Sequence, residues 1–281
     1  MNRITMLVAT VVAGLLALTA FPFLPGRYDG LSAPLSSLAL VVGVGSLLLV
    51  PVGFLWLGYE LILKPSGPRR ARARFAGVAL GMLTFVMLIA FVAASGLFAM
   101  SLGVAVLGGW AFALWRGSGR ALAGAREGDG SYARPALAMI VVPIVVGGAQ
   151  LGMAGPLQEW SRDRVMDEMQ HLIDDIEAYG VAHGEYPRAL FSEWMDYRPE
   201  IVGVRGYQYE PVGDSYSIAV EIPTFSPSSR DYLMYNPHDA FKMASHDMWP
   251  LTWPADRLAL HRGYALAREV GRPHWRLLIF D

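Results

Sequence analysis

The chain has 281 residues, of which 54% are hydrophobic and only 17% are charged, whereas about a quarter of the residues of a soluble protein are charged. Residues 1–157 hold eleven Lys and Arg against four Asp and Glu, and residues 158–281 hold twelve against twenty. The acidic second half disfavours nucleic acid as a partner. The lack of Cys excludes disulfides, thiolate zinc sites and a cysteine nucleophile.

The first half contains four apolar blocks, which are Ile4–Leu24, Leu35–Leu63, Phe75–Trp115 and Ala136–Leu157. A helix needs about 20 apolar residues to cross the roughly 30 Å hydrocarbon core of a bilayer, so the first and last blocks each predict one span. The second block is longer than a span requires and contains Pro51, which predicts one tilted or kinked helix.

The third block is too long for one span, because as a single helix it would reach about 60 Å. It predicts a helical hairpin that turns at Ser95-Gly96. The first half therefore predicts an α-helical membrane bundle of about five transmembrane helices, at residues 4–24, 35–63, 75–94, 97–115 and 136–157.

The basic residues of the connecting segments predict the orientation. Lys and Arg crowd residues 64–74 and 116–134, Arg3 leads the chain, and the opposite side shows only Arg27. Short basic loops stay in the cytoplasm, so we expect a multi-pass protein of the inner (plasma) membrane, with membrane lipid around it. Its N-terminus is expected to be cytoplasmic and residues 158–281 extracytoplasmic. A single span over 75–115 would instead place the two basic loops on opposite faces.

Other interpretations of the first half stay open. Ile4–Leu24 also fits a cleaved signal peptide, because Arg3 precedes an apolar run, although no clear A-x-A site precedes Gly26. The small-residue spacings Gly77/Gly81 and Gly148/Gly152 fit helix-packing faces, but glycine is common in such helices.

No ionisable residue lies deep in a predicted span, so these helices are expected to serve as anchors. Glu60 lies near a cytoplasmic end beside Lys64, where it is expected to reach water. Gln150 is expected to join packed helices.

Residues 158–281 predict an α+β domain, with a long helix packed on an antiparallel sheet. The helix is amphipathic over Ser161–Tyr179, with Ser161 as its N-cap and an end near His183-Gly184. Its acidic residues 174, 175 and 177 are expected on a solvated face. The strand-like stretches are Tyr207–Pro211, Ser215–Ile222, Asp231–Tyr235 and His274–Phe280. Residues 236–272 are expected to be irregular, with a short helix over Asp256–Val270.

A short motif follows the amphipathic helix: Tyr179 is followed by Gly184-Glu185-Tyr186-Pro187 and Leu190. This "Y…G-x-Y-P-x-x-L" pattern, followed by a small sheet, resembles the globular part of type II secretion pseudopilins and type IV pilin-like proteins over Ser161–Ile222. The resemblance implies a pilin-like periplasmic domain. The block Ala136–Leu157 has neither the Gly-Phe type of processing site nor the acidic residue of pilins, so processing and filament assembly are not implied.

A weak metal site is the main chemical candidate. His238, Asp239, His246 and Asp247 lie in one irregular segment, and His with carboxylate suits divalent transition metals. The spacing matches no metal motif, and charge-paired surface histidines explain it as well. No cofactor other than such a divalent cation is expected. Trp249, Trp253 and Trp275 fit either a recognition patch or core positions.

The sequence shows no nucleophile elbow, H-E-x-x-H or P-loop motif, so no catalytic residue is predicted. We expect a structural, interaction or sensor protein of the membrane whose C-terminal domain binds an envelope protein or a ligand. The alternative is an envelope enzyme or transporter component with an unrecognised site in the C-terminal domain.

Overall fold

The computed structural model describes residues 3–63, 69–97, 100–127, 133–190, 198–212, 214–225, 230–244, 250–254 and 266–280. The chain divides into two compact units. The first, the helical unit, comprises residues 1–20 and 34–154. The second, the sheet unit, comprises residues 21–33 and 155–281, and is therefore built from two stretches far apart in the sequence.

The helical elements are α1 (Arg3–Ala20), α2 (Ser32–Gly45), α3 (Leu49–Leu63), α4 (Arg69–Leu97), α5 (Met100–Glu127) and α6 (Ala133–His183). Helices long and apolar enough to cross a membrane cover Met6–Phe23, Ser32–Ile62, Arg72–Val92 and Arg134–His183 among the described residues. The prediction of several long apolar helices is thus confirmed. The helix α5 does not belong to this group, because its apolar start continues into a basic end that begins at Arg116.

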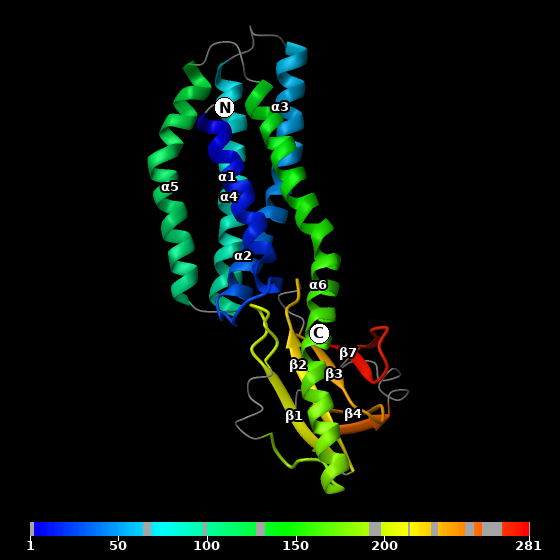
Figure 1. Cartoon of the computed structure of the whole chain (residues 1–281). Helices are drawn as coiled ribbons and strands as arrows, with labels where there is room; N and C mark the ends of the chain where they lie inside the picture. The colour runs from blue at the N-terminus through cyan, green and yellow to red at the C-terminus, as the bar shows by residue number, and fades with distance from the viewer. Residues whose placement is uncertain are drawn as a thin grey trace. The chain divides into compact units, whose positions relative to one another are not determined.

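The predicted kink and the predicted hairpin both correspond to breaks in the helices. A 3-10 turn, η2 (Ser46–Leu48), separates α2 from α3 just before Pro51, whose missing N–H leaves the carbonyl of Leu47 without its helical partner. The third apolar block forms two helices, α4 and α5, which lie side by side in Figure 1. The helix α4 ends at Leu97, slightly beyond the predicted Ser95-Gly96 turn.

The small-residue spacings noted in the sequence are not the contact points of these helices. A Cβ added at Gly77, Gly81, Gly148 or Gly152 would meet no atom within 4 Å in the described part of the chain. The close approaches occur at other glycines, where side chains of neighbouring helices fill the space, namely Gly43, Gly45, Gly53 and Gly147.

One continuous helix, α6, contains both the last apolar block and the amphipathic helix of the second half. The prediction that a new helix begins at Ser161 is wrong, because Ser161 is buried inside α6 and its hydroxyl donates to the carbonyl of Gln158 at 3.1 Å. Pro156 removes only one backbone hydrogen bond, and buried residues such as Val165 and Met166 hold the helix beyond it.

The end of α6 at His183 agrees with the prediction. Gly184 has a φ of +75°, which glycine adopts without the steric cost that a Cβ brings. Its N–H donates to the carbonyl of Gly180 at 2.8 Å and so satisfies one of the last carbonyls of the helix.

The sheet unit contains a five-stranded antiparallel sheet in the order β1-β2-β3-β7-β6. The strands are β1 (Tyr207–Val212), β2 (Ser215–Ile222), β3 (Arg230–Tyr235), β6 (Leu266–Glu269) and β7 (Trp275–Phe280). The apolar face of α6 lies against this sheet (Figure 1), and the shared core includes Met169, Leu172, Ile176, Ile218, Val220 and Leu233. The predicted small antiparallel sheet is therefore confirmed.

Residues 236–272 hold more regular structure than predicted. The strands β4 (Ala240–Ala244) and β5 (Pro250–Pro254) pair with each other as a separate two-stranded sheet. The helix predicted over Asp256–Val270 is wrong at Leu266–Glu269, which forms β6 beside β7, and residues 255–265 lie outside the described residues. The sequence Leu-Ala-Arg-Glu favours a helix by intrinsic propensity, and pairing with β7 overrides that preference.

Candidate functional site

The predicted metal ligands do not come together in the described residues. His238 is exposed, and its backbone N–H donates to the side-chain oxygen of Asn236 at 2.9 Å. Asp239 is paired instead with His274, whose Nδ1 lies 3.5 Å from a carboxylate oxygen. His246 and Asp247 lie outside the described residues. Among the residues that the structure describes, no group of three or more His, Asp and Glu could hold a metal ion.

The three tryptophans of the predicted recognition patch differ in where they lie. Trp275 is a core residue, only 2% exposed, and its ring packs 5.3 Å from that of Tyr235. Trp249 lies outside the described residues, and Trp253 belongs to β5, where it pairs with Phe241 across the hairpin. For Trp275 the core interpretation is therefore the right one.

A polar cluster of the sheet unit centres on Glu177. This half-buried carboxylate accepts the hydroxyl of Tyr216 on one oxygen at 2.8 Å and that of Tyr186 on the other at 3.0 Å. The two tyrosine rings meet edge to face, with centroids 4.8 Å apart. The sequence assigned Glu177 to a solvated acidic face, which is wrong, because this turn of α6 faces β2 and the segment that follows the helix.

These contacts give each residue of the Gly-x-Tyr-Pro-x-x-Leu motif a structural role. Gly184 ends α6, and Tyr186 folds back to bind Glu177. The carbonyl of Pro187 accepts the hydroxyl of Tyr209 on β1 at 2.6 Å, and Leu190 packs against the core. The motif thus fastens the segment after α6 to both the helix and the sheet.

Burial and the carboxylate of Glu177 keep the phenols of this cluster protonated. Burial, followed by the hydrogen bond to Glu177, raises the pKa of Tyr186 to about 12 and also raises the pKa of Tyr216. Burial raises the pKa of Tyr209 to about 12. At neutral pH these neutral phenols donate to the carboxylate and so join the sheet and the segment after α6 to the helix.

We expect these tyrosine hydrogen bonds to stabilise the fold less at high pH. An unfolded tyrosine titrates near pH 10, whereas folded Tyr186 and Tyr209 hold their protons up to about pH 12. Between these values the unfolded state binds fewer protons than the folded state, so the free energy of unfolding falls as pH rises. In Tyr186→Phe that fall is shallower, because one of these protons is gone. Melting temperatures from pH 8 to 12 measure the slope, and equal slopes for both proteins would contradict the assignment.

The segment 21–33 is a part of the sheet unit that the sequence did not predict. It lies between α1 and α2, yet its backbone bonds to residues 200–203: Gly26 N–H donates to Glu200 at 2.9 Å, and Val202 N–H donates to Leu24 at 3.0 Å. Asp29 and Gly203 complete the run of contacts. Phe23 is fully buried, and its ring stacks on Phe225 with centroids 4.6 Å apart.

A signal for this docking exists in the sequence. The run Phe21-Pro22-Phe23-Leu24-Pro25 is apolar and aromatic, whereas a connection between helices that only faces solvent would be polar. Such a run indicates that another part of the protein covers this segment, but it does not indicate which later segment does so.

A buried ion pair joins α3 to α4 in the helical unit. The guanidinium of Arg72 donates to both carboxylate oxygens of Glu60, at 2.8 and 3.1 Å, and the indole N–H of Trp56 adds a third bond at 3.2 Å. Arg72 is only 7% exposed. The expectation that Glu60 reaches water beside Lys64 is wrong, since its charge is matched inside the protein by Arg72.

Gln150 joins three helices, as its position in an apolar helix suggested. Its side-chain nitrogen donates to the hydroxyl of Thr19 on α1 at 2.8 Å and to the carbonyl of Ala39 on α2 at 2.9 Å. Ser36 adds a bond to the carbonyl of Thr19 at 2.8 Å. The amide is fully buried, so α1, α2 and α6 are held together by hydrogen bonds that water cannot replace.

Comparison with protein-family models, with curated proteins and with solved structures finds no match for this chain.

Proposed function

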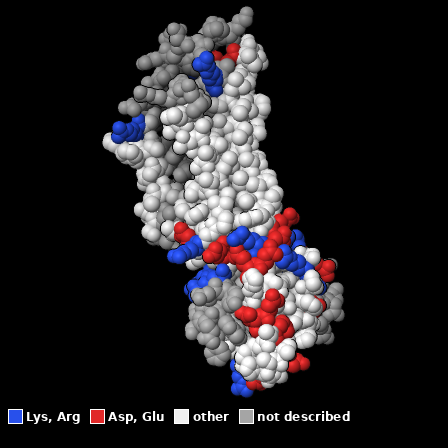
Figure 2. All heavy atoms as spheres, in the orientation of Figure 1, with Lys and Arg blue, Asp and Glu red and all other residues white. Residues whose placement is uncertain are grey.

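We propose that the chain is an integral membrane protein whose sheet unit lies outside the cytoplasm and serves as an interaction or sensor module. The apolar helices support the membrane location. We count α5 as a fifth span, because it packs on α4 and because five spans place all the basic segments on one side. Charged side chains gather on the sheet unit in Figure 2, while the visible described surface of the helical unit carries few.

The observation that carries the proposal is the membership of residues 21–33 in the sheet unit. The chain enters the sheet unit after α1, returns to α2, and enters it again within α6, so three covalent connections join the two units. An inert domain needs only one tether. Three connections to three different helices suit a module whose ligand or partner must influence the membrane helices.

The pilin-like resemblance belongs to this proposal as a fold hypothesis. It is supported by the long helix that packs on an antiparallel sheet and by the structural roles of Gly184, Tyr186 and Pro187. The docked segment 21–33 is an addition to that pattern, because its buried Phe23 stacks on Phe225 from a position far earlier in the sequence.

The proposed orientation predicts the labelling of single cysteines. The natural chain has no Cys, so each introduced thiol is the only one present. We expect a membrane-impermeant maleimide to label Val181→Cys, at an 88% exposed position, in intact spheroplasts. Ser66→Cys, between α3 and α4, is expected to react only after the membrane is opened. The reverse pattern, or labelling of both in intact spheroplasts, would reject the orientation.

The interaction role is tested with the same thiol. A heterobifunctional photo-cross-linker attached to Val181→Cys in the native host's membrane is expected to give one defined adduct with an envelope protein. The matched control is Gly148→Cys on α6, whose position faces open space within the apolar part of the chain and is expected to give no such adduct. Equal adducts at both positions, or none at several exposed sites of the sheet unit, would count against an interaction module.

A further inference from the structure

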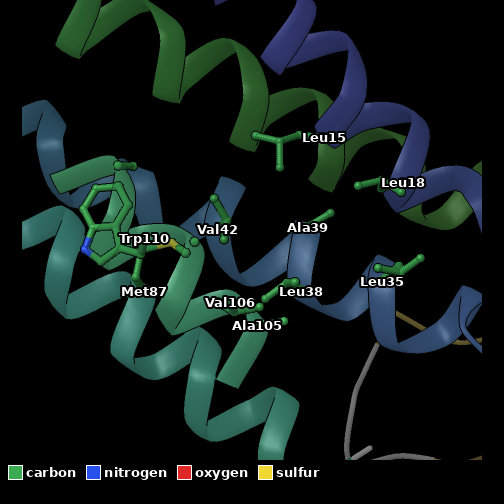
Figure 3. Close-up of a pocket in the computed structure, with 12 residues that line it drawn as sticks. Leu15, Leu18, Leu35, Leu38, Ala39, Val42, Met87, Ala105, Val106 and Trp110 are labelled. Carbon is green, nitrogen blue, oxygen red and sulfur yellow. The ribbon is translucent and has the colours of Figure 1, made fainter. Parts of the chain in front are cut away.

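A cavity of about 370 Å³ lies within the helical unit. Figure 3 shows the helices α1, α2, α4 and α5 around it, with Leu15 from α1, Val42 from α2, Met87 from α4 and Trp110 from α5 on its walls. The wall formed by α5 also includes small residues at four-residue intervals, Ala105, Gly109 and Ala113. All three are exposed, so the cavity opens to the surroundings along this stripe.

The lining offers nothing to a polar occupant. The lining side chains are aliphatic or aromatic, apart from the thioether of Met87 and the indole nitrogen of Trp110. That nitrogen already donates to the hydroxyl of Thr84 at 3.3 Å, and the hydroxyl of Thr84 donates to the carbonyl of Leu80 at 2.8 Å. A buried water needs two to four polar partners, so water is a poor occupant of this space.

Among the described residues, the cavity is lined only by α1, α2, α4 and α5. Stripes of small residues usually let two helices approach closely, but the space next to Gly109 is open in the described part of the chain. The cavity touches four helices, and its apolar lining suits a hydrocarbon chain.

We propose that this cavity binds one acyl chain of a membrane phospholipid, which enters across the stripe formed by Ala105, Gly109 and Ala113. The inference rests on the proposed membrane location, because that location makes hydrocarbon the surrounding solvent. The acyl chain fills a space whose lining side chains would otherwise lack contact partners. Its binding also places a lipid against α1 and α2, the two helices that the segment 21–33 connects.

The test uses phospholipid vesicles that contain a trace of phosphatidylcholine with a diazirine in the middle of one acyl chain. The full-length protein is reconstituted, irradiated, and mapped residue by residue with mass spectrometry. In the natural protein we expect label at Val42 and Met87 in the cavity, and also at Leu151, a 61% exposed residue of α6.

Gly109→Leu places a large side chain at the opening of the cavity and is expected to abolish the label at Val42 and Met87 while the label at Leu151 remains. The matched control is Gly108→Leu, since Gly108 is equally exposed with open space around it but does not line the cavity. Ala113→Leu blocks the same stripe and serves as the second variant if Gly109→Leu does not fold.

Each other outcome overturns the proposal in a distinct way. Label at Leu151 without label at Val42 or Met87 in the natural protein would reject the lipid site and leave the membrane location intact. The same pattern in a protein that runs as a dimer would assign the groove to a second copy of the chain. Label in the cavity that survives both Gly109→Leu and Ala113→Leu would also reject the site. No label at any of the three residues would reject the site and the membrane location together.

Discussion

Phe23→Ala is expected to lower the free energy of unfolding of the sheet unit by about 3–5 kcal/mol, the usual cost of removing a fully buried phenylalanine. Phe23 is 0% exposed and stacks on Phe225, although it lies far from the rest of the unit in sequence. Native-state hydrogen exchange of the amides of β2 and β3 in the full-length protein measures the effect, because these central strands report the opening of the whole unit.

The neighbouring residue provides the control. Leu24 is 41% exposed, and its docking contacts are made by the backbone, so Leu24→Ala should change the same amides by no more than about 0.5 kcal/mol. If Phe23→Ala leaves β2 and β3 as protected as Leu24→Ala does, the segment 21–33 is not part of the core of the sheet unit.

Gly43→Ala is expected to destabilise the helical unit by about 1–3 kcal/mol, the usual cost of overpacking a filled core. The added Cβ would lie 1.9 Å from the side-chain oxygen of Gln150. The amide cannot move away without breaking its bonds to Thr19 and to the carbonyl of Ala39. Equilibrium unfolding of the full-length protein in detergent micelles, followed by helical circular dichroism, measures the change.

A double-mutant cycle separates this clash from a general effect of alanine. Gln150→Ala removes the group that Gly43→Ala would strike, so the double variant should lose less stability than the sum of the single variants, with a coupling of about 0.5–3 kcal/mol. Gly148→Ala is the neutral control, because its Cβ points into open space in the described structure. Strict additivity would mean that Gly43 and Gln150 are not in contact.

The sequence correctly predicted those helices and strands whose formation depends on nearby residues alone. The alternation of Tyr216, Ile218 and Val220 predicted a half-buried strand; this strand is β2, although Ser215 and Ser217 on its other face are buried as well. The length of the third apolar block required it to fold back, and α4 and α5 do so. The end of α6 followed from Gly184, because a glycine after the last helical turn is a local stop signal.

The features that the sequence missed depend on distant partners. Ser161 has the chemistry of an N-cap, but the buried residues on both sides of Pro156 extend α6 through it. Leu266–Glu269 has helical propensity and becomes a strand because β7 offers an edge. The sequence pattern placed Glu177 among the solvated acidic residues, whereas in the structure it accepts hydrogen bonds from Tyr186 and Tyr216. A periodicity shows which face is polar, and it cannot show that two distant hydroxyls will meet one carboxylate.

The docking of residues 21–33 also sets an order of events during biosynthesis. Phe23 leaves the ribosome about 200 residues before Phe225, and at roughly 5–20 residues per second this interval is on the order of 10–40 s. Throughout it, the aromatic segment 21–33 has no surface to pack on, because the later chain provides Ile201, Val202 and Phe225. A polypeptide that stops short of these residues lacks the surface that buries Phe23 in the finished chain.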